Sequence, residues 1–199
     1  MDGKLTRRRL LELGLVAPSV AAVAGHTDLF GTPALAATPA IADADEPTPA
    51  LTEGPYFTPQ SPKRRSIVPA GAAGTRLTLT GRVLRTNGRP VANALVDFWQ
   101  ADARGAYDNS GYRFRGHQFT DGQGRYALQS VVPGLYPGRT KHIHVKVQAP
   151  RKPLLTTQLF FPGVAGNRSD SIFTTDCLIR GWRLVEGRRH ARFDFVLPV

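Results

Sequence analysis

An alternation of apolar and polar residues runs through residues 142–149, which read HIHVKVQA. Successive side chains of an extended strand point to opposite faces, so Ile143, Val145 and Val147 share one face while His142 and His144 share the other. The pattern therefore predicts a β-strand with one core face and one face that carries two histidines. Two imidazoles at positions i and i+2 of a strand are placed to share one metal ion.

Similar short strands, separated by turn signals, are predicted through most of the chain. Leu77, Leu79 and Val83 alternate with polar neighbours, and further strands are expected at residues 94–100, 125–130, 156–161 and 193–197. Gly, Pro, Asn and Asp separate these segments, and no apolar period of helix length is present. We therefore predict an all-β fold, a single antiparallel β-sandwich. Residues 164–179 are left as a short helix or a long loop.

The first 36 residues have the pattern of a twin-arginine export signal. Arg7, Arg8 and Arg9 precede a weakly polar run, and cleavage sites are expected after Ala24 or Ala36, of which we favour the second. That run is too short and too interrupted to predict a membrane-spanning helix, so none is expected in the mature protein. The predicted location is extracellular or in a bacterial cell envelope. An uncleaved amphipathic start of a cytoplasmic protein is the alternative.

Composition divides the rest of the chain into a linker and one domain. Residues 37–51 are rich in Ala, Pro, Asp and Glu, which predicts a disordered or extended linker, and the ordered domain is expected to cover residues 52–199. The formal net charge of +11 favours anionic partners. Because the basic residues are scattered and no nucleic-acid motif is present, we expect carboxylated aromatics or acidic polymers rather than nucleic acid. The single cysteine, Cys177, excludes an intrachain disulfide.

Two tyrosines in turn-rich segments are the nearest further candidates for metal ligands. Tyr107 follows Gly-Ala, and Tyr136 lies in a Pro-Gly-Leu-Tyr-Pro-Gly segment. Loops commonly display functional side chains. A phenol has a pKa of about 10 and binds as phenolate only when a Lewis-acidic cation replaces its proton. Two imidazoles and two phenolates would favour ferric iron, whereas the histidine pair alone leaves zinc or copper open. Tyr112 is a second candidate for the phenolate of its loop.

Six segments, in order along the chain, together resemble the intradiol ring-cleaving dioxygenases, the group of the protocatechuate and catechol dioxygenases. They are residues 52–57 (TEGPYF), 96–107 (VDFWQADARGAY), 120–126 (TDGQGRY), 133–140 (PGLYPGRT), 142–144 (HIH) and 157–163 (TQLFFPG). The resemblance implies a prealbumin-like β-sandwich with a non-haem ferric ion (Fe3+) as cofactor. It also implies an oxidoreductase that uses dioxygen to cleave a catechol-type ring between its two hydroxylated carbons, giving a muconic acid derivative.

The resemblance also implies individual roles for the residues that match its motifs. Tyr107 and His142 resemble the equatorial iron ligands, and Tyr136 and His144 resemble the axial pair. Tyr136 would first bind the metal and then act as a base towards the substrate. Arg139 resembles the arginine that stabilises negative charge on the ring. Gln158 matches the active-site glutamine, and Tyr56 matches an aromatic residue near the pocket.

The sequence also bears on the pocket wall, the oligomeric state and a rival interpretation. Only five residues separate Tyr136 from His142, which suits a reduced pocket wall and the small exported members of the family. All four implied ligands lie on one chain, so a homo-oligomer is neither required nor excluded. The rival interpretation is a non-catalytic prealbumin-like or carbohydrate-binding β-sandwich module, because fold alone assigns no chemistry.

Overall fold

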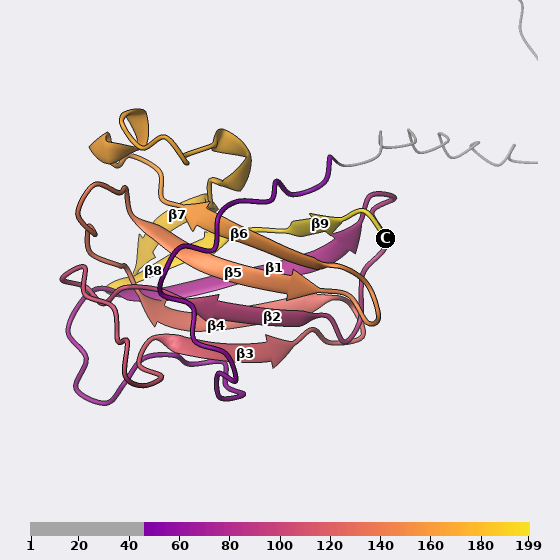
Figure 1. Ribbon diagram of the computed structural model, residues 1–199, viewed down its shortest axis with the longest axis horizontal. Helices are drawn as coiled ribbons and strands as arrows, with labels where there is room; N and C mark the ends of the chain where they lie inside the picture. The colour runs from indigo at the N-terminus through magenta and orange to yellow at the C-terminus, as the bar shows by residue number, and fades with distance from the viewer. Residues whose placement is uncertain (1–45) are drawn as a thin grey trace, which may run out of the picture. The chain divides into compact units, whose positions relative to one another are not determined.

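The computed structural model describes residues 46–199, which form a sandwich of two β-sheets (Figure 1). The predicted export signal, residues 1–36, and residues 37–45 of the predicted linker lie outside the described residues. One sheet has the order β4-β1-β8-β7, with β9 also paired to β1, and the other has the order β3-β2-β5-β6. The strands of the first sheet are β1 (Arg76–Arg85), β4 (Arg125–Val131), β7 (Arg180–Val185), β8 (Arg188–Arg192) and β9 (Phe195–Leu197). Those of the second are β2 (Leu95–Trp99), β3 (Arg115–Phe119), β5 (His142–Gln148) and β6 (Leu154–Phe160).

The β-sandwich predicted from the alternating pattern is confirmed, with three strands that the pattern did not predict. These are β3, β7 and β8, which read RGHQF, RGWRLV and RRHAR and lack a regular apolar alternation. The first sheet is also mixed rather than wholly antiparallel, because β1 runs parallel to both β8 and β9. The second sheet is antiparallel throughout.

The core lies between the two sheets and contains the apolar faces that alternation predicted. Ile143, Val145 and Val147 are fully buried there, together with Leu77 and Leu79 of the opposite sheet. Burying such side chains stabilises the fold by roughly 1.5–3 kcal/mol each. The histidine face of β5 is buried as well, with His142 4% and His144 3% exposed. The two imidazoles are therefore enclosed by protein.

The last six residues of the predicted linker are extended and ordered. Residues 46–51 lie along the sandwich: Thr48 exchanges two hydrogen bonds with Val196, at 2.9 and 2.8 Å, and the Leu51 amide donates to the Thr156 carbonyl at 2.9 Å. The Thr157 hydroxyl donates to the Pro49 carbonyl. Composition suggested disorder because the segment has few apolar side chains, but its order comes from hydrogen bonds to strands far away in the sequence.

Residues 164–179, which the sequence left unassigned, form two short 3₁₀ helices joined by turns. These helices are η2 (Ala165–Arg168) and η3 (Thr175–Cys177). Asp170, between them, is buried, and its carboxylate accepts the Ile172 amide. Among residues 46–199 no helix is long and apolar enough to cross a membrane.

Candidate active site

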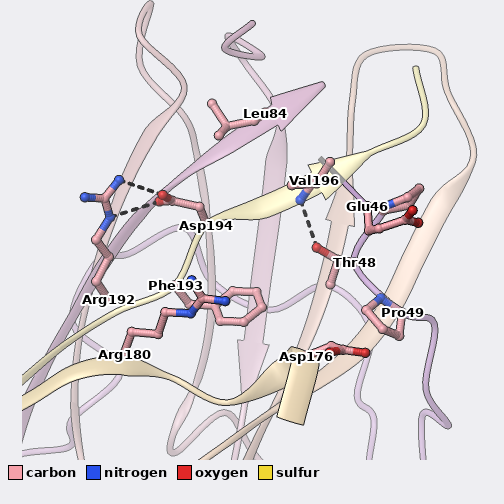
Figure 2. A pocket seen from close by; sticks show the side chains of 11 residues that line it. Glu46, Thr48, Pro49, Leu84, Asp176, Arg180, Arg192, Phe193, Asp194 and Val196 are labelled. Atoms are coloured by element: carbon pink, nitrogen blue, oxygen red, sulfur yellow. Dashed lines mark hydrogen bonds and ion pairs between the residues drawn. The ribbon is translucent and has the colours of Figure 1, made fainter. Parts of the chain in front are cut away.

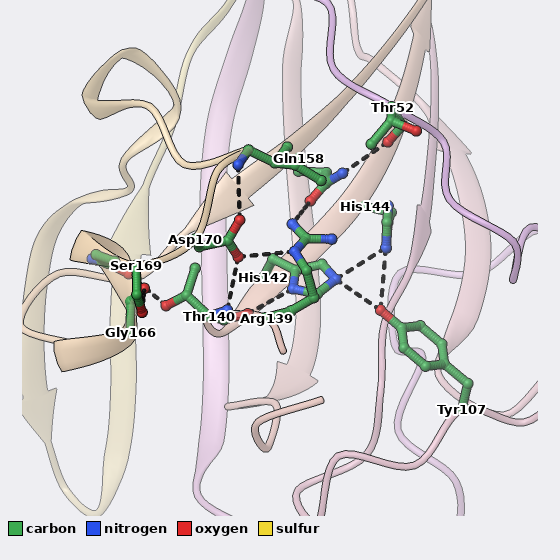
Figure 3. Close-up of polar contacts among 12 residues, drawn as sticks. Thr52, Tyr107, Arg139, Thr140, His142, His144, Gln158, Gly166, Ser169 and Asp170 are labelled. Atoms are coloured by element: carbon green, nitrogen blue, oxygen red, sulfur yellow. Dashed lines mark hydrogen bonds and ion pairs between the residues drawn. The ribbon is translucent and has the colours of Figure 1, made fainter. Parts of the chain in front are cut away.

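Three side-chain atoms from two segments converge on one point at the start of β5. The Tyr107 hydroxyl lies 3.0 Å from His142 Nε2 and 3.1 Å from His144 Nε2, and the two imidazole nitrogens are 3.1 Å apart (Figure 3). His142 and His144 project from the same face of β5, as the i, i+2 spacing predicts. Ligand atoms that sit at right angles around one ion, each roughly 2.0–2.1 Å from it, are about 3 Å apart. The triangle therefore has the size that one metal ion requires.

The available protons cannot satisfy all three contacts of this triangle. His142 Nδ1 lies 2.7 Å from the Thr140 carbonyl, which can only accept, so Nδ1 carries the proton and Nε2 presents a lone pair. The Tyr107 hydroxyl has one proton, and a proton on His144 Nε2 could complete only one further contact. At least one pair of atoms in the triangle therefore has no hydrogen bond between them. A bound cation would interact favourably with all three atoms.

The charge states that burial imposes also suit a cation. Burial lowers the pKa of His142 to about 4, and burial followed by neighbouring cationic groups lowers the pKa of His144 well below its usual value. Both imidazoles are thus neutral near pH 7. Burial raises the pKa of Tyr107, against the opposing charges of Arg139 and Arg115. The phenol would ionise near neutral pH only if a strong Lewis acid replaced its proton.

Tyr136 lies beside this triangle. Its ring centroid is 5.8 Å from that of Tyr107, and its hydroxyl forms a 2.7 Å hydrogen bond with the Tyr56 hydroxyl. Tyr56 in turn stacks on Tyr107, with centroids 4.7 Å apart. This hydrogen bond raises the pKa of Tyr56. The structure thus brings Tyr107, Tyr136, His142 and His144 together, and places Tyr56 among them.

Glycines allow the loops that carry the two tyrosines to touch. Gly105, two residues before Tyr107, has φ +91°, and a Cβ there would lie 2.0 Å from the Leu135 carbonyl oxygen. A Cβ on Gly134, two residues before Tyr136, would lie 2.3 Å from the Gly105 amide nitrogen. The Gly134 amide also donates to the Asp102 carbonyl at 2.8 Å. Both tyrosine motifs therefore need glycine for backbone contact between the loops.

The His144 ring is positioned by packing. The Trp99 ring stacks on it, with centroids 4.8 Å apart and planes 7° from parallel. On another side, Gly54 approaches so closely that a Cβ there would lie 3.4 Å from His144 Cε1. His144 Nδ1 is buried and has no hydrogen-bond partner among the described residues. Stacking, rather than a hydrogen bond to Nδ1, thus fixes the ring plane.

Arg139 and Gln158 contact each other next to the histidines. The sequence interpretation expected both residues in one site. Arg139 Nη2 donates to Gln158 Oε1 at 2.7 Å, and Gln158 Nε2 donates to the Thr52 carbonyl at 2.8 Å (Figure 3). Arg139 Nε donates to Asp170 Oδ2 at 2.8 Å. The arrangement presents a fixed positive charge beside the triangle.

Sequence reasoning missed two residues that build this site. Asp170 holds Arg139, and Arg115 holds the loops. Arg115 is 1% exposed and donates to the Asp108 carbonyl from Nε and Nη2 and to the Tyr56 carbonyl from Nη1. Neither residue belongs to a motif, since each acts through contacts distant in sequence. Tyr112, the alternative phenolate, is 37% exposed and donates to the Pro59 carbonyl, away from the triangle.

Two surface cavities lie near this part of the fold or apart from it, and neither is lined by Tyr107, His142 or His144. A cavity of about 500 Å³ is bordered by Glu46, Arg180 and Val196, among others, and none of its lining residues belongs to the site (Figure 2). A cavity of about 570 Å³ borders Tyr136 and Arg139 on the loop that leads into β5. The second is the one connected with the candidate site.

The donor atoms that converge at this site include a tyrosine oxygen. Within residues 46–199 no group of three or more His, Cys, Asp or Glu side chains could hold a metal ion. The converging donors are two imidazole nitrogens and a phenol oxygen, with a second phenol adjacent. This donor set fits a hard, Lewis-acidic ion and lacks the thiolates that structural zinc prefers.

Comparisons with known proteins match most of the described chain. The family model described as Dioxygenase matches residues 52–198. The chain is 31% identical to the 6-chlorohydroxyquinol 1,2-dioxygenase of Cupriavidus pinatubonensis and 30% identical to the hydroxyquinol 1,2-dioxygenase of Nocardioides simplex, over 72% and 75% of its length. These matches cover 62% and 64% of the two relatives, so the chain spans less than two thirds of their length.

A solved structure gives a similar result. The dioxygenase domain of a dioxygenase carbohydrate-binding protein fusion from the cellulolytic bacterium Streptomyces sp. SirexAA-E is 51% identical and superposes with a TM-score of 0.75. That match covers 77% of this chain and 99% of the domain. The similarity therefore extends over the whole of that domain.

Proposed function

Because this chain belongs to the intradiol ring-cleaving dioxygenase family, we propose that it cleaves a catechol-type ring between the two hydroxylated carbons, with dioxygen as second substrate. The product would be a muconic acid derivative. The observation that carries the proposal is the convergence of Tyr107, His142 and His144, with Tyr136 and Arg139 beside them. A non-catalytic binding module would need none of these buried donors.

The proposed cofactor is a non-haem ferric ion held by Tyr107, Tyr136, His142 and His144. Support comes from the 3.0–3.1 Å triangle, from the neutral state of both imidazoles and from the absence of an alternative His, Cys, Asp or Glu cluster among the described residues. When bound, ferric iron supplies Lewis acidity that withdraws electron density from a chelated catecholate.

Tyr136 is the proposed base for a substrate hydroxyl. Of the two tyrosines in the proposed ligand set, Tyr136 is the one whose hydroxyl forms a hydrogen bond with another phenol, that of Tyr56, at 2.7 Å. A Tyr136 oxygen that takes a substrate proton keeps this partner, so the hydroxyl stays oriented while its protonation changes. Arg139 supplies a fixed cation beside the ring, where negative charge develops, and Gln158 holds that cation in place.

The proposed substrates are small catechols, including hydroxyquinols. Support comes from the names of the relatives. Oxygen uptake with product spectra, measured on catechol, protocatechuate, hydroxyquinol and caffeate, tests the proposal. We expect uptake with a muconic-type product and a protein coloured by tyrosinate-to-iron charge transfer. A colourless protein that contains stoichiometric zinc and consumes no oxygen would contradict both the cofactor and the reaction.

We also propose export by the twin-arginine route, supported by the Arg7-Arg8-Arg9 segment before an apolar run. That route moves folded proteins, so a cofactor could be loaded before export. Fractionation of cells that express the parent and a variant with lysine at all three arginines tests the proposal. We expect the variant to accumulate in the cytoplasm, and equal export of both would refute it.

A further inference from the structure

A buried carboxylate lies directly behind the arginine of the candidate site. The Asp170 side chain is 1% exposed, and its Oδ2 accepts two hydrogen bonds of 2.8 Å, one from Arg139 Nε and one from the Thr140 amide. Its Oδ1 accepts the Ile172 amide at 2.9 Å. A buried carboxylate with three donors is a fixed group, because leaving any of these donors without a partner is unfavourable.

Through Thr140 the same carboxylate reaches a histidine of the triangle. The Thr140 amide donates to Asp170, and the Thr140 carbonyl accepts from His142 Nδ1 at 2.7 Å. The Thr140 hydroxyl donates to Asn167 Oδ1 at 2.6 Å, which ties the residue to helix η2. Residues 165–170 thus hold one short segment, Arg139-Thr140, by three hydrogen bonds.

The guanidinium group of Arg139 is anchored on two edges. Asp170 occupies Nε and Gln158 occupies Nη2, while Nη1 has no hydrogen-bond partner within residues 46–199. Figure 3 shows the guanidinium group between Asp170 and His144. Because the group is planar, two anchors fix its orientation as well as its position. Nη1 is the nitrogen left for an incoming ligand.

We propose that Asp170 is a positioning residue, which orients Arg139 towards the substrate. The proposal rests on the proposed function for its kinetic consequences. It assigns a role to the 165–170 segment, which contributes no group to the triangle itself. A carboxylate that orients an active-site group typically contributes about 10- to 100-fold in activity.

The test compares Asp170→Asn with the parent enzyme. The amide is of equal size and keeps one acceptor, but it loses the charge that holds Arg139 Nε. We expect kcat to fall about 10- to 100-fold while iron content stays at the parent level. Asp170→Glu, which keeps the charge, should recover part of this loss. Asp176→Asn, which makes the same chemical change at an exposed position nearby, should leave kcat unchanged.

A double-mutant cycle with Arg139→Ala separates positioning from a general structural role. If Asp170 acts through Arg139, Asp170→Asn should cause little further loss of kcat in the Arg139→Ala background. An equal fold-loss of kcat in both backgrounds would overturn the proposal, as would a parent-like kcat for Asp170→Asn.

A measurement that does not depend on activity tests the positioning role separately from the proposed function. In the metal-free protein, NMR should show the Arg139 Nε–H and Thr140 amide protons protected from solvent exchange in the parent. Both should exchange faster in Asp170→Asn, whereas distant core amides should not change. Equal exchange of these two protons in parent and variant would also overturn the proposal, whether or not the protein consumes oxygen.

Discussion

Replacing Gly105 with alanine is expected to separate the two loops that carry Tyr107 and Tyr136. The new Cβ would lie 2.0 Å from the Leu135 carbonyl oxygen, and reaching an ordinary contact of 3.4 Å requires a displacement of about 1.4 Å. The left-handed backbone costs a non-glycine residue about 1 kcal/mol, and overpacking adds about 1–3 kcal/mol. We therefore expect a loss of about 3 kcal/mol in the free energy of unfolding, together with weaker iron binding.

Gly71→Ala is the matched control, because Gly71 has φ +68° and a Cβ there meets nothing within 4 Å. At about 3 °C per kcal/mol, Gly105→Ala should lower the unfolding midpoint by about 9 °C and Gly71→Ala by about 3 °C. Calorimetry and iron analysis of both variants check this. If Gly105→Ala unfolded like Gly71→Ala and kept the parent's iron content, the contact between the loops would not be what brings the tyrosines together.

Three further predictions follow from single contacts. Tyr107→Phe should lose most of its iron and its colour, whereas Tyr112→Phe, whose hydroxyl donates to the Pro59 carbonyl away from the triangle, should keep both; iron analysis and visible spectra measure this. Arg139→Ala should keep iron and lose about 100-fold or more in kcat, because it removes a fixed charge; full turnover would refute that role. Burial alone would raise the pKa of Asp170, but its hydrogen bonds from Thr140, Ile172 and Arg139 hold that pKa below its usual value. The ionised carboxylate therefore stabilises the fold above about pH 4, and this stabilisation is lost as the pH falls through the lowered pKa. The difference in unfolding midpoint between the parent and Asp170→Asn should narrow on acidification, and a constant difference would contradict the assignment.

Alternation and spacing predicted the parts of the fold that depend on local pattern. The β5 segment was recognisable because its apolar residues recur at every second position, and that alternation placed His142 and His144 on one face. Tyr126, which belongs to the predicted strand at 125–130, lies in the core, and its hydroxyl donates to the Phe193 carbonyl. Local pattern was sufficient where apolar side chains alternate along a strand that packs against the core.

Features that depend on distant contacts were not predictable in this way. Strand β8 reads RRHAR, and its pairing with β1 joins residues more than a hundred positions apart. Asp170 and Arg115 stand outside recognisable motifs, yet each is buried against backbone groups of the site. Their importance arises from hydrogen bonds that form only after folding, so a linear pattern carries no signal for them.

The paired hydrogen bonds between Thr48 and Val196 bring together the two ends of the described chain. Figure 1 shows the first described residues and the carboxyl end on the same side of the sandwich. Neighbouring ends are the arrangement that tolerates circular permutation or insertion into a host protein. A short peptide joining the two ends, with new ends opened in the exposed Asn87-Gly88 turn, should therefore leave the Tyr107–His142–His144 triangle intact.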